Sequence, residues 1–122
     1  MSRVIHFEIP ASDPERAANF YRKTFGWTIE KWPGPMDYWL VTTGADGMPG
    51  INGGLLKKQA PTNATTNTIG VDSVDAAVES VKQAGGKLIM PKTAIPTIGY
   101  FAYLEDTEGN LFGVMQADKN AK

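Results

Sequence analysis

The sequence of 122 residues contains no cysteine, which excludes disulfides, thiolate metal ligands and cysteine nucleophiles. An excess of positive charge is also missing, because 12 Lys and Arg face 13 Asp and Glu and the formal net charge is −1. Nucleic acid and anionic membranes are therefore not expected partners. No apolar run is long enough for a signal peptide or a membrane-spanning helix, and a cytoplasmic location is expected.

Histidine is nearly absent too, since His6 is the only one. A metal site needs three or four N, O or S donors that converge on one point. Glu8 lies two residues after His6 and would share its face of a strand. An unusual site using these two residues with Asn52 or Asn67 stays open, but strand alternation does not place either asparagine beside them. We therefore predict no bound metal and no cofactor.

The length suits one domain, and 42% hydrophobic residues can supply a core. In the first half, period-two alternation predicts a strand at Val4–Ile9. Ser12 or Asp13 is expected to cap a helix with Pro14 in its first turn, and Gly26 to end it. Three further strands are predicted at Trp27–Lys31, Tyr38–Thr42 and Ile51–Lys57.

The second half repeats this order after a polar, proline-bearing connection at residues 59–66. A strand at Asn67–Val71 precedes a helix that Ser73 caps and that Gly85-Gly86 ends. Strands are then predicted at Lys87–Met90, Tyr100–Glu105 and Leu111–Gln116.

An internal repeat supports this division. A constant offset of about 60 residues pairs residues of the same kind in the two halves. The pairs are Ile9 with Ile69, Asp13 with Ser73, Glu15 with Asp75, Ala17 with Ala77, Gly26 with Gly86 and Gly53 with Gly113. We predict a single domain over residues 1–122, built from two βαβββ modules at about 1–58 and 66–117.

The most identifying segment is residues 105–116, Glu-Asp-Thr-Glu-Gly-Asn-Leu-Phe-Gly-Val-Met-Gln. It reads as a tight turn around Gly109 followed by a half-buried strand. The segment resembles the closing hairpin of the glyoxalase/bleomycin resistance/dioxygenase superfamily, with its vicinal oxygen chelate fold, usually Asp-Pro-x-Gly-Asn before the last strand. The resemblance implies an α+β fold in which two βαβββ modules form a cupped, eight-stranded mixed sheet, with helices outside and the ligand inside.

The resemblance also implies where a metal site would lie. In metal-dependent relatives the first and last strand of each module each give one ligand. Here these positions fall on His6 and Gly53 in the first module and on Thr66 and Gly113 in the second. Only His6 is a competent ligand, so the chain is similar to a metalloenzyme fold that has lost much of its metal site.

The expected binding residues follow from alternation and from this carry-over. His6 and Glu8 should face the ligand with Gly53 and Gly113 beside them, while Phe7 and Ile9 pack under a helix. Tyr38 and Trp39 have opposite parity on one strand, and the sequence does not settle which of them faces inward. The predicted ligand-binding residues are His6, Glu8, Trp39, Gly53, Thr66, Phe101 and Gly113.

These observations favour binding of a small organic molecule without a metal, in the style of bleomycin resistance proteins, with a homodimer expected by analogy. The alternative is a metal-dependent glyoxalase-like lyase or isomerase, or a ring-cleaving dioxygenase. A non-catalytic regulatory module is a third possibility. His6 could be a plain hydrogen-bonded residue, a ligand contact or an acid–base group, so whether the chain is an enzyme stays open.

Overall fold

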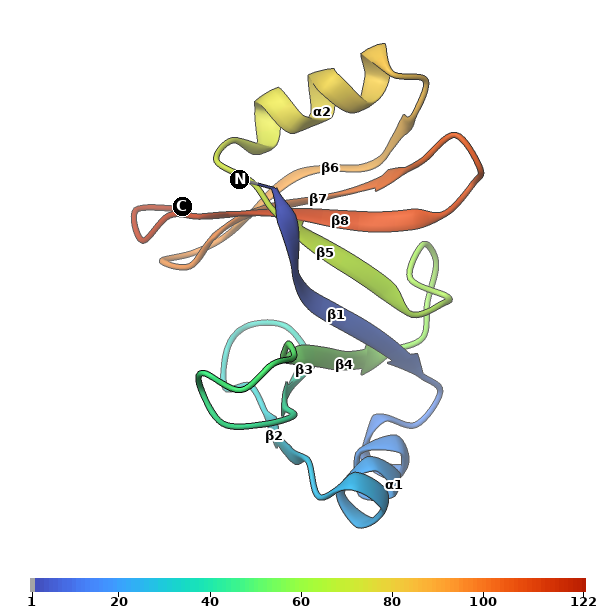
Figure 1. Ribbon diagram of the computed structural model, residues 1–122, viewed down its shortest axis with the longest axis vertical. Helices are drawn as coiled ribbons and strands as arrows, with labels where there is room; N and C mark the ends of the chain where they lie inside the picture. Colours follow the sequence, from blue (N-terminus) through green and yellow to red (C-terminus); the bar gives the residue numbers. More distant parts are fainter. Residues whose placement is uncertain (1) are drawn as a thin grey trace. The chain divides into compact units, whose positions relative to one another are not determined.

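A computed structural model describes residues 2–122 of the chain, and it shows a strand, a helix and three strands, twice (Figure 1). The eight strands belong to one mixed sheet, which two helices accompany. The predicted α+β class and the two βαβββ modules are therefore confirmed. The elements are β1 (Arg3–Ala11), α1 (Pro14–Phe25), β2 (Thr28–Lys31), β3 (Tyr38–Thr42), β4 (Gly53–Lys57), β5 (Thr66–Gly70), α2 (Val74–Gln83), β6 (Lys87–Ile95), β7 (Gly99–Glu105) and β8 (Leu111–Ala117).

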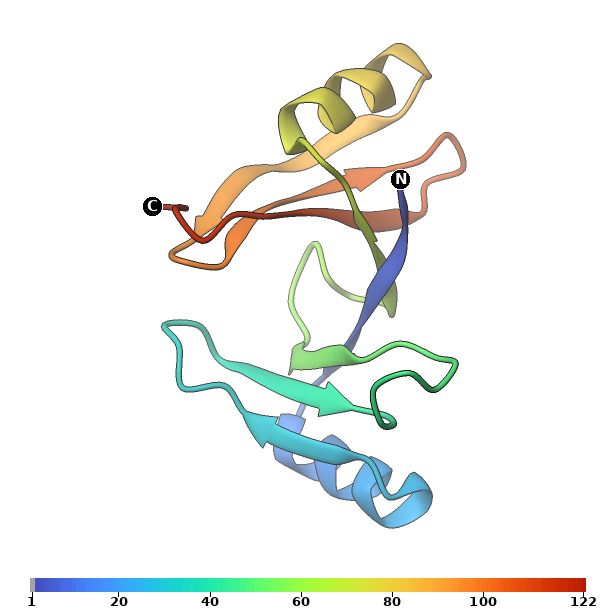
Figure 2. The same cartoon turned by 60° about the vertical axis from the view of Figure 1, so that its left-hand side comes forward.

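The chain divides into two compact units. The first unit is Ile5–Thr66, and the second is Asn67–Lys122 together with residues 2–4. In the first unit the strand order is β2-β3-β4-β1, where β3 is antiparallel to both neighbours and β1 is parallel to β4. In the second unit the order is β5-β8-β7-β6, with β5 parallel to β8 and the other pairs antiparallel (Figure 2).

Both helices begin at the predicted caps. The Asp13 side chain accepts a hydrogen bond from the Arg16 amide at 3.1 Å, and the Ser73 hydroxyl accepts one from the Ala76 amide at 3.1 Å. Helix α1 ends at Gly26, whose φ of 71° is the left-handed conformation that glycine adopts most readily. No helix in residues 2–122 is long and apolar enough to cross a membrane.

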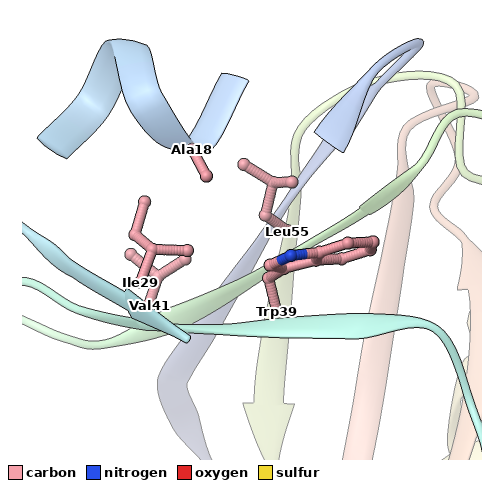
Figure 3. Close-up of a cluster of buried hydrophobic side chains, with 5 residues drawn as sticks. All are labelled: Ala18, Ile29, Trp39, Val41 and Leu55. Atoms are coloured by element: carbon pink, nitrogen blue, oxygen red, sulfur yellow. The ribbon is translucent and has the colours of Figure 1, made fainter. Parts of the chain in front are cut away.

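Each unit buries one face of its strands under its own helix. In the first unit, Ala18 of α1 points toward side chains of β2, β3 and β4 (Figure 3). In the second, Val74 of α2 packs with Ala102, Leu104 and Val114. The opposite face of each set of strands is therefore the one that its helix leaves uncovered.

Strand β6 differs most from its prediction, because it continues through Pro91 to Ile95 rather than ending at Met90. It is the last strand in the order, and its pairing with β7 shifts register between Leu88 and Met90 and again between Met90 and Thr93. Edge strands and bulges are the places where a sheet tolerates proline. The proline that ended the predicted strand is therefore accommodated within the real one.

Candidate functional site

Strand β1 directs its side chains as predicted. Phe7 packs against the core under α1, so His6 and Glu8 point to the other face. Glu8 is only 8% exposed. A buried carboxylate needs hydrogen-bond donors, because transfer of an ion out of water is costly. The surroundings of Glu8 therefore decide what this face can do.

Tyr38 of β3 joins the two β1 residues. Its hydroxyl donates to Oε2 of Glu8 at 2.8 Å and lies 2.6 Å from Nε2 of His6. The Tyr38 and His6 rings also stack, with centroids 6.2 Å apart and planes 15° from parallel. We call His6, Glu8, Tyr38 and the adjoining Gly54 the His6 face.

The number of available protons fixes the direction of these hydrogen bonds. A tyrosine hydroxyl has one proton, and an ionised carboxylate can only accept. When Tyr38 donates to Glu8, its oxygen can only accept from His6, so Nε2 of His6 must carry a proton. The neutral imidazole then has its lone pair on Nδ1. This tautomer follows from the chain of contacts rather than from observed hydrogen atoms.

Burial and charge act on His6 in opposite directions. Burial lowers the pKa of His6 below its ordinary value of 6.5, and the nearby Glu8 carboxylate partly offsets this by raising it. Burial is the larger effect, so His6 is neutral at pH 7. The same carboxylate would stabilise an imidazolium whenever one formed.

Gly54 makes room for Tyr38. An ideal Cβ built on Gly54 would lie 1.8 Å from the Tyr38 hydroxyl oxygen, far inside van der Waals contact. Gly54 pairs with Glu8 in the parallel register of β1 and β4. The hydroxyl that links His6 to Glu8 therefore occupies the space of the missing side chain.

The prediction that Gly53 shares this face is wrong. Gly53 pairs with Phe7, and a Cβ on it would meet the Phe7 ring at 2.5 Å, on the side of α1. In the second unit Gly113 pairs with Thr68 and does face away from the helix core. The structural counterpart of Gly113 is thus Gly54, one residue away from the position that the constant offset gives.

Trp39, which was named as a binding residue, lies on the other face. It is 7% exposed in the core under α1, and its indole N–H donates to Glu15 at 2.7 Å. Its neighbour Tyr38 is the β3 residue on the His6 face. Strand alternation placed these two residues on opposite faces, but the sequence did not show which of them packs under α1.

The second unit has a face of its own around Gly113. A Cβ on Gly113 would lie 3.3 Å from Oγ1 of Thr68, which is slightly tight, and 3.6 Å from Cε1 of Tyr103, which is ordinary van der Waals contact. Phe101 meets Tyr103 edge to face, with ring centroids 5.8 Å apart. We call Thr68, Phe101, Tyr103 and Gly113 the Gly113 face.

Thr66, the remaining predicted site residue, is 2% exposed at the start of β5. Within residues 2–122, its hydroxyl oxygen is a buried side-chain atom without a hydrogen-bond partner. Such an atom normally finds a partner in a ligand or water.

The residues present do not fit the metal that the fold resemblance implies. Nothing in residues 2–122 brings three or more His, Asp or Glu side chains together as a set of ligands. The two donors that β1 supplies, His6 and Glu8, are both engaged with Tyr38. Gly53 and Gly113 have no side chains to offer as ligands. A divalent ion needs more donors than this.

The order of a strand, a helix and three strands, present twice in the chain, points to the class of protein. The family model described as "Glyoxalase/Bleomycin resistance protein/Dioxygenase superfamily" matches residues 3–114. The chain therefore belongs to this superfamily, and the resemblance seen in the closing hairpin is confirmed.

Known relatives agree with this assignment. The chain is 33% identical over 117 residues to a "Glyoxylase-like domain-containing protein" of Didymella fabae, covering 88% of each. It is 30% identical over 119 residues to "Putative glyoxylase CFP32" of Mycobacterium bovis, covering 93% of this chain but only 45% of that protein. Methylmalonyl-CoA epimerase from Mycobacterium tuberculosis has a similar fold, with a TM-score of 0.69, 13% identity, and coverage of 94% of this chain and 87% of that one.

Proposed function

We propose that the chain binds a small organic molecule on the His6 face and does so without a protein-bound metal. One observation carries this proposal: Tyr38 fills the space over Gly54 and ties His6 to Glu8. The donors that could begin a metal site are thereby held as a hydrogen-bonded group. Such a group can orient a polar ligand instead.

The chemistry of this face limits the ligand. Neutral His6 offers the Nδ1 lone pair, which accepts a hydrogen bond from an O–H, N–H or polarised C–H group. Buried Glu8 disfavours an anionic ligand nearby, because like charges repel strongly where water is scarce. The proposed ligand is therefore neutral and carries a donor group.

Two measurements test the proposal together. Metal analysis of untagged protein purified without chelators should give far less than one Zn, Ni, Fe or Mn per chain. A library of neutral small molecules should be screened for binding by the amide chemical shifts of the protein. A ligand should cause saturable shifts in β1, β3 and β4. His6→Gln should weaken this binding and Tyr100→Phe should not. Close to one metal per chain, lost in His6→Gln, would overturn the metal-free part and favour the lyase, isomerase or dioxygenase alternative.

The proposal also extends to assembly and location. The superfamily resemblance supports a homodimer, and sedimentation analysis at micromolar concentration would measure it; a monomer at every concentration would remove this part. A cytoplasmic location rests on the lack of cysteine, and cell fractionation would test it.

A further inference from the structure

We propose that the outer side of α1 is a docking surface for an acidic segment of another protein. This surface consists of Arg16, Phe20 and Lys23, and we call it the Phe20 face. It lies on the side of α1 opposite Ala18, the residue that packs on the strands (Figure 3). It is separate from the His6 face and does not depend on a ligand there.

The Phe20 face is turned toward solvent. Residues at i, i+4 and i+7 of a helix lie along one side, and this spacing joins Arg16, Phe20 and Lys23. All three residues are exposed, and Phe20 keeps 57% of its surface accessible. Single exposed apolar residues are common on proteins, so exposure alone does not mark Phe20 as a contact.

Neighbouring aromatic rings support Phe20 and extend its surface. Phe20 meets Tyr21 edge to face with centroids 5.1 Å apart, and Tyr21 stacks on Trp27, also at 5.1 Å. Phe25, which is 62% exposed, lies 5.6 Å from Trp27. Rings that their neighbours already hold lose little conformational freedom when a partner covers them. Exposed aromatic residues of this kind are enriched in protein–protein interfaces.

Two unpaired positive charges border Phe20. The salt bridge within α1 joins Arg22 to Glu15. Among residues 2–122, neither Arg16 nor Lys23 has a salt bridge to a carboxylate. An acidic partner would supply the missing carboxylates. A second copy of the chain that met this face symmetrically would instead bring like charges together, which is unfavourable. The charges therefore favour an acidic occupant.

The second helix shows that the fold does not require this surface. Counted from the two helix caps, the counterparts of the Phe20 face in α2 are Ala76, Ser80 and Gln83. They are exposed as well, but they offer neither an aromatic ring nor a charge. Both helices pack on their strands through the opposite side. Packing thus does not explain the ring and the charges on α1, whereas a contact with another molecule does.

The spacing of the charges describes the occupant. Arg16 and Lys23 are separated by two turns of helix, which is about 10 Å along the axis. The partner segment should therefore carry two carboxylates about 10 Å apart, with an apolar side chain between them to cover Phe20. Two turns of an acidic helix with Glu or Asp at i and i+7 meet this requirement.

A random peptide library tests the inference. It is selected on the wild type and depleted on the triple variant Arg16→Ala, Phe20→Ser, Lys23→Gln, which gives α1 the outer residues of α2. Enriched peptides should carry two carboxylates two helical turns apart around an apolar residue. A synthetic peptide of enriched sequence should bind the wild type about tenfold more tightly than the triple variant. Added salt should weaken this binding. Lys82→Gln, which removes one positive charge from α2, should bind as the wild type does.

No enrichment, enriched peptides without an excess of acidic residues, or equal affinity for the wild type and the triple variant would overturn the inference. So would a wild-type dimer in sedimentation that the triple variant loses, since the occupant would then be a second copy. Binding to vesicles of anionic lipid that the triple variant loses would also overturn it. If the triple variant does not fold, Phe20→Ser alone takes its place and should lose most of the affinity.

Discussion

The two units place a glycine at equivalent points of their last strands and use it in different ways. Above Gly54 the space is taken by Tyr38, whose hydroxyl lies 1.8 Å from where a Cβ would be. Above Gly113 the nearest atoms, on Thr68 and Tyr103, lie 3.3 and 3.6 Å from that point. Both units thus have a glycine at this point, but only in the first does a hydrogen-bonded tyrosine occupy the space beside it.

The largest effect is expected when Gly54 gains a methyl group. Gly54→Ala must displace Tyr38, break its bonds to His6 and Glu8, and crowd the strand, so unfolding free energy should fall by about 1–3 kcal/mol. Urea unfolding followed by tryptophan fluorescence would measure the loss. In a Tyr38→Ala background the same substitution should have little further effect, and an unchanged loss there would break the proposed coupling.

Removal of the Tyr38 hydroxyl should come next. Tyr38→Phe keeps the ring but takes a donor from the buried Glu8 carboxylate, which should lower stability by about 1–3 kcal/mol. Tyr100→Phe in the second unit is the control and should change stability by less than about 0.5 kcal/mol. Equal effects in both units would mean that the Tyr38 hydroxyl has no special role.

A pH effect should also separate the units, because only the first contains a histidine. The pKa of folded His6 lies below the unfolded value of about 6.5, mainly because of burial. Below pH 6.5 the unfolded state therefore binds a proton first, and stability should decline as the pH falls toward the folded pKa. His6→Gln should remove this part of the decline. Identical pH profiles of unfolding free energy for the wild type and the variant would contradict it.

The smallest effect is expected at Gly113. A methyl group there makes ordinary to slightly tight contacts, and alanine also restricts the unfolded chain. Gly113→Ala should therefore change the unfolding free energy by less than about 1 kcal/mol in either direction. A loss of unfolding free energy as large as that of Gly54→Ala would show that the two glycine positions are equally filled, which would contradict the difference between the units.

The sequence predicted the elements of this fold well because its signals are local. Helix caps at Asp13 and Ser73, the Gly109 turn and the alternation of β1 all depend on neighbouring residues. The face on which Gly53 lies depends instead on how β4 pairs with β1, and the repeat offset slips by one residue between these strands.

The site itself required the same kind of long-range information. Tyr38 and Trp39 both suit a strand, and only the packing of α1 on Trp39 decides that Tyr38 reaches Glu8. Tyr38 is 30 positions from Glu8 and 32 positions from His6 in the sequence. No motif spacing marks them, so sequence patterns could name His6 and Glu8 but not their partner.

The most direct test of a metal-free His6–Tyr38–Glu8 group is the ¹⁵N spectrum of the His6 ring at pH 7, recorded before and after addition of one equivalent of Zn²⁺. As the only histidine, His6 gives a single set of side-chain signals. We expect a neutral ring protonated on Nε2, unchanged by zinc. A saturable zinc-induced shift of these signals that Glu8→Gln abolishes would contradict the account.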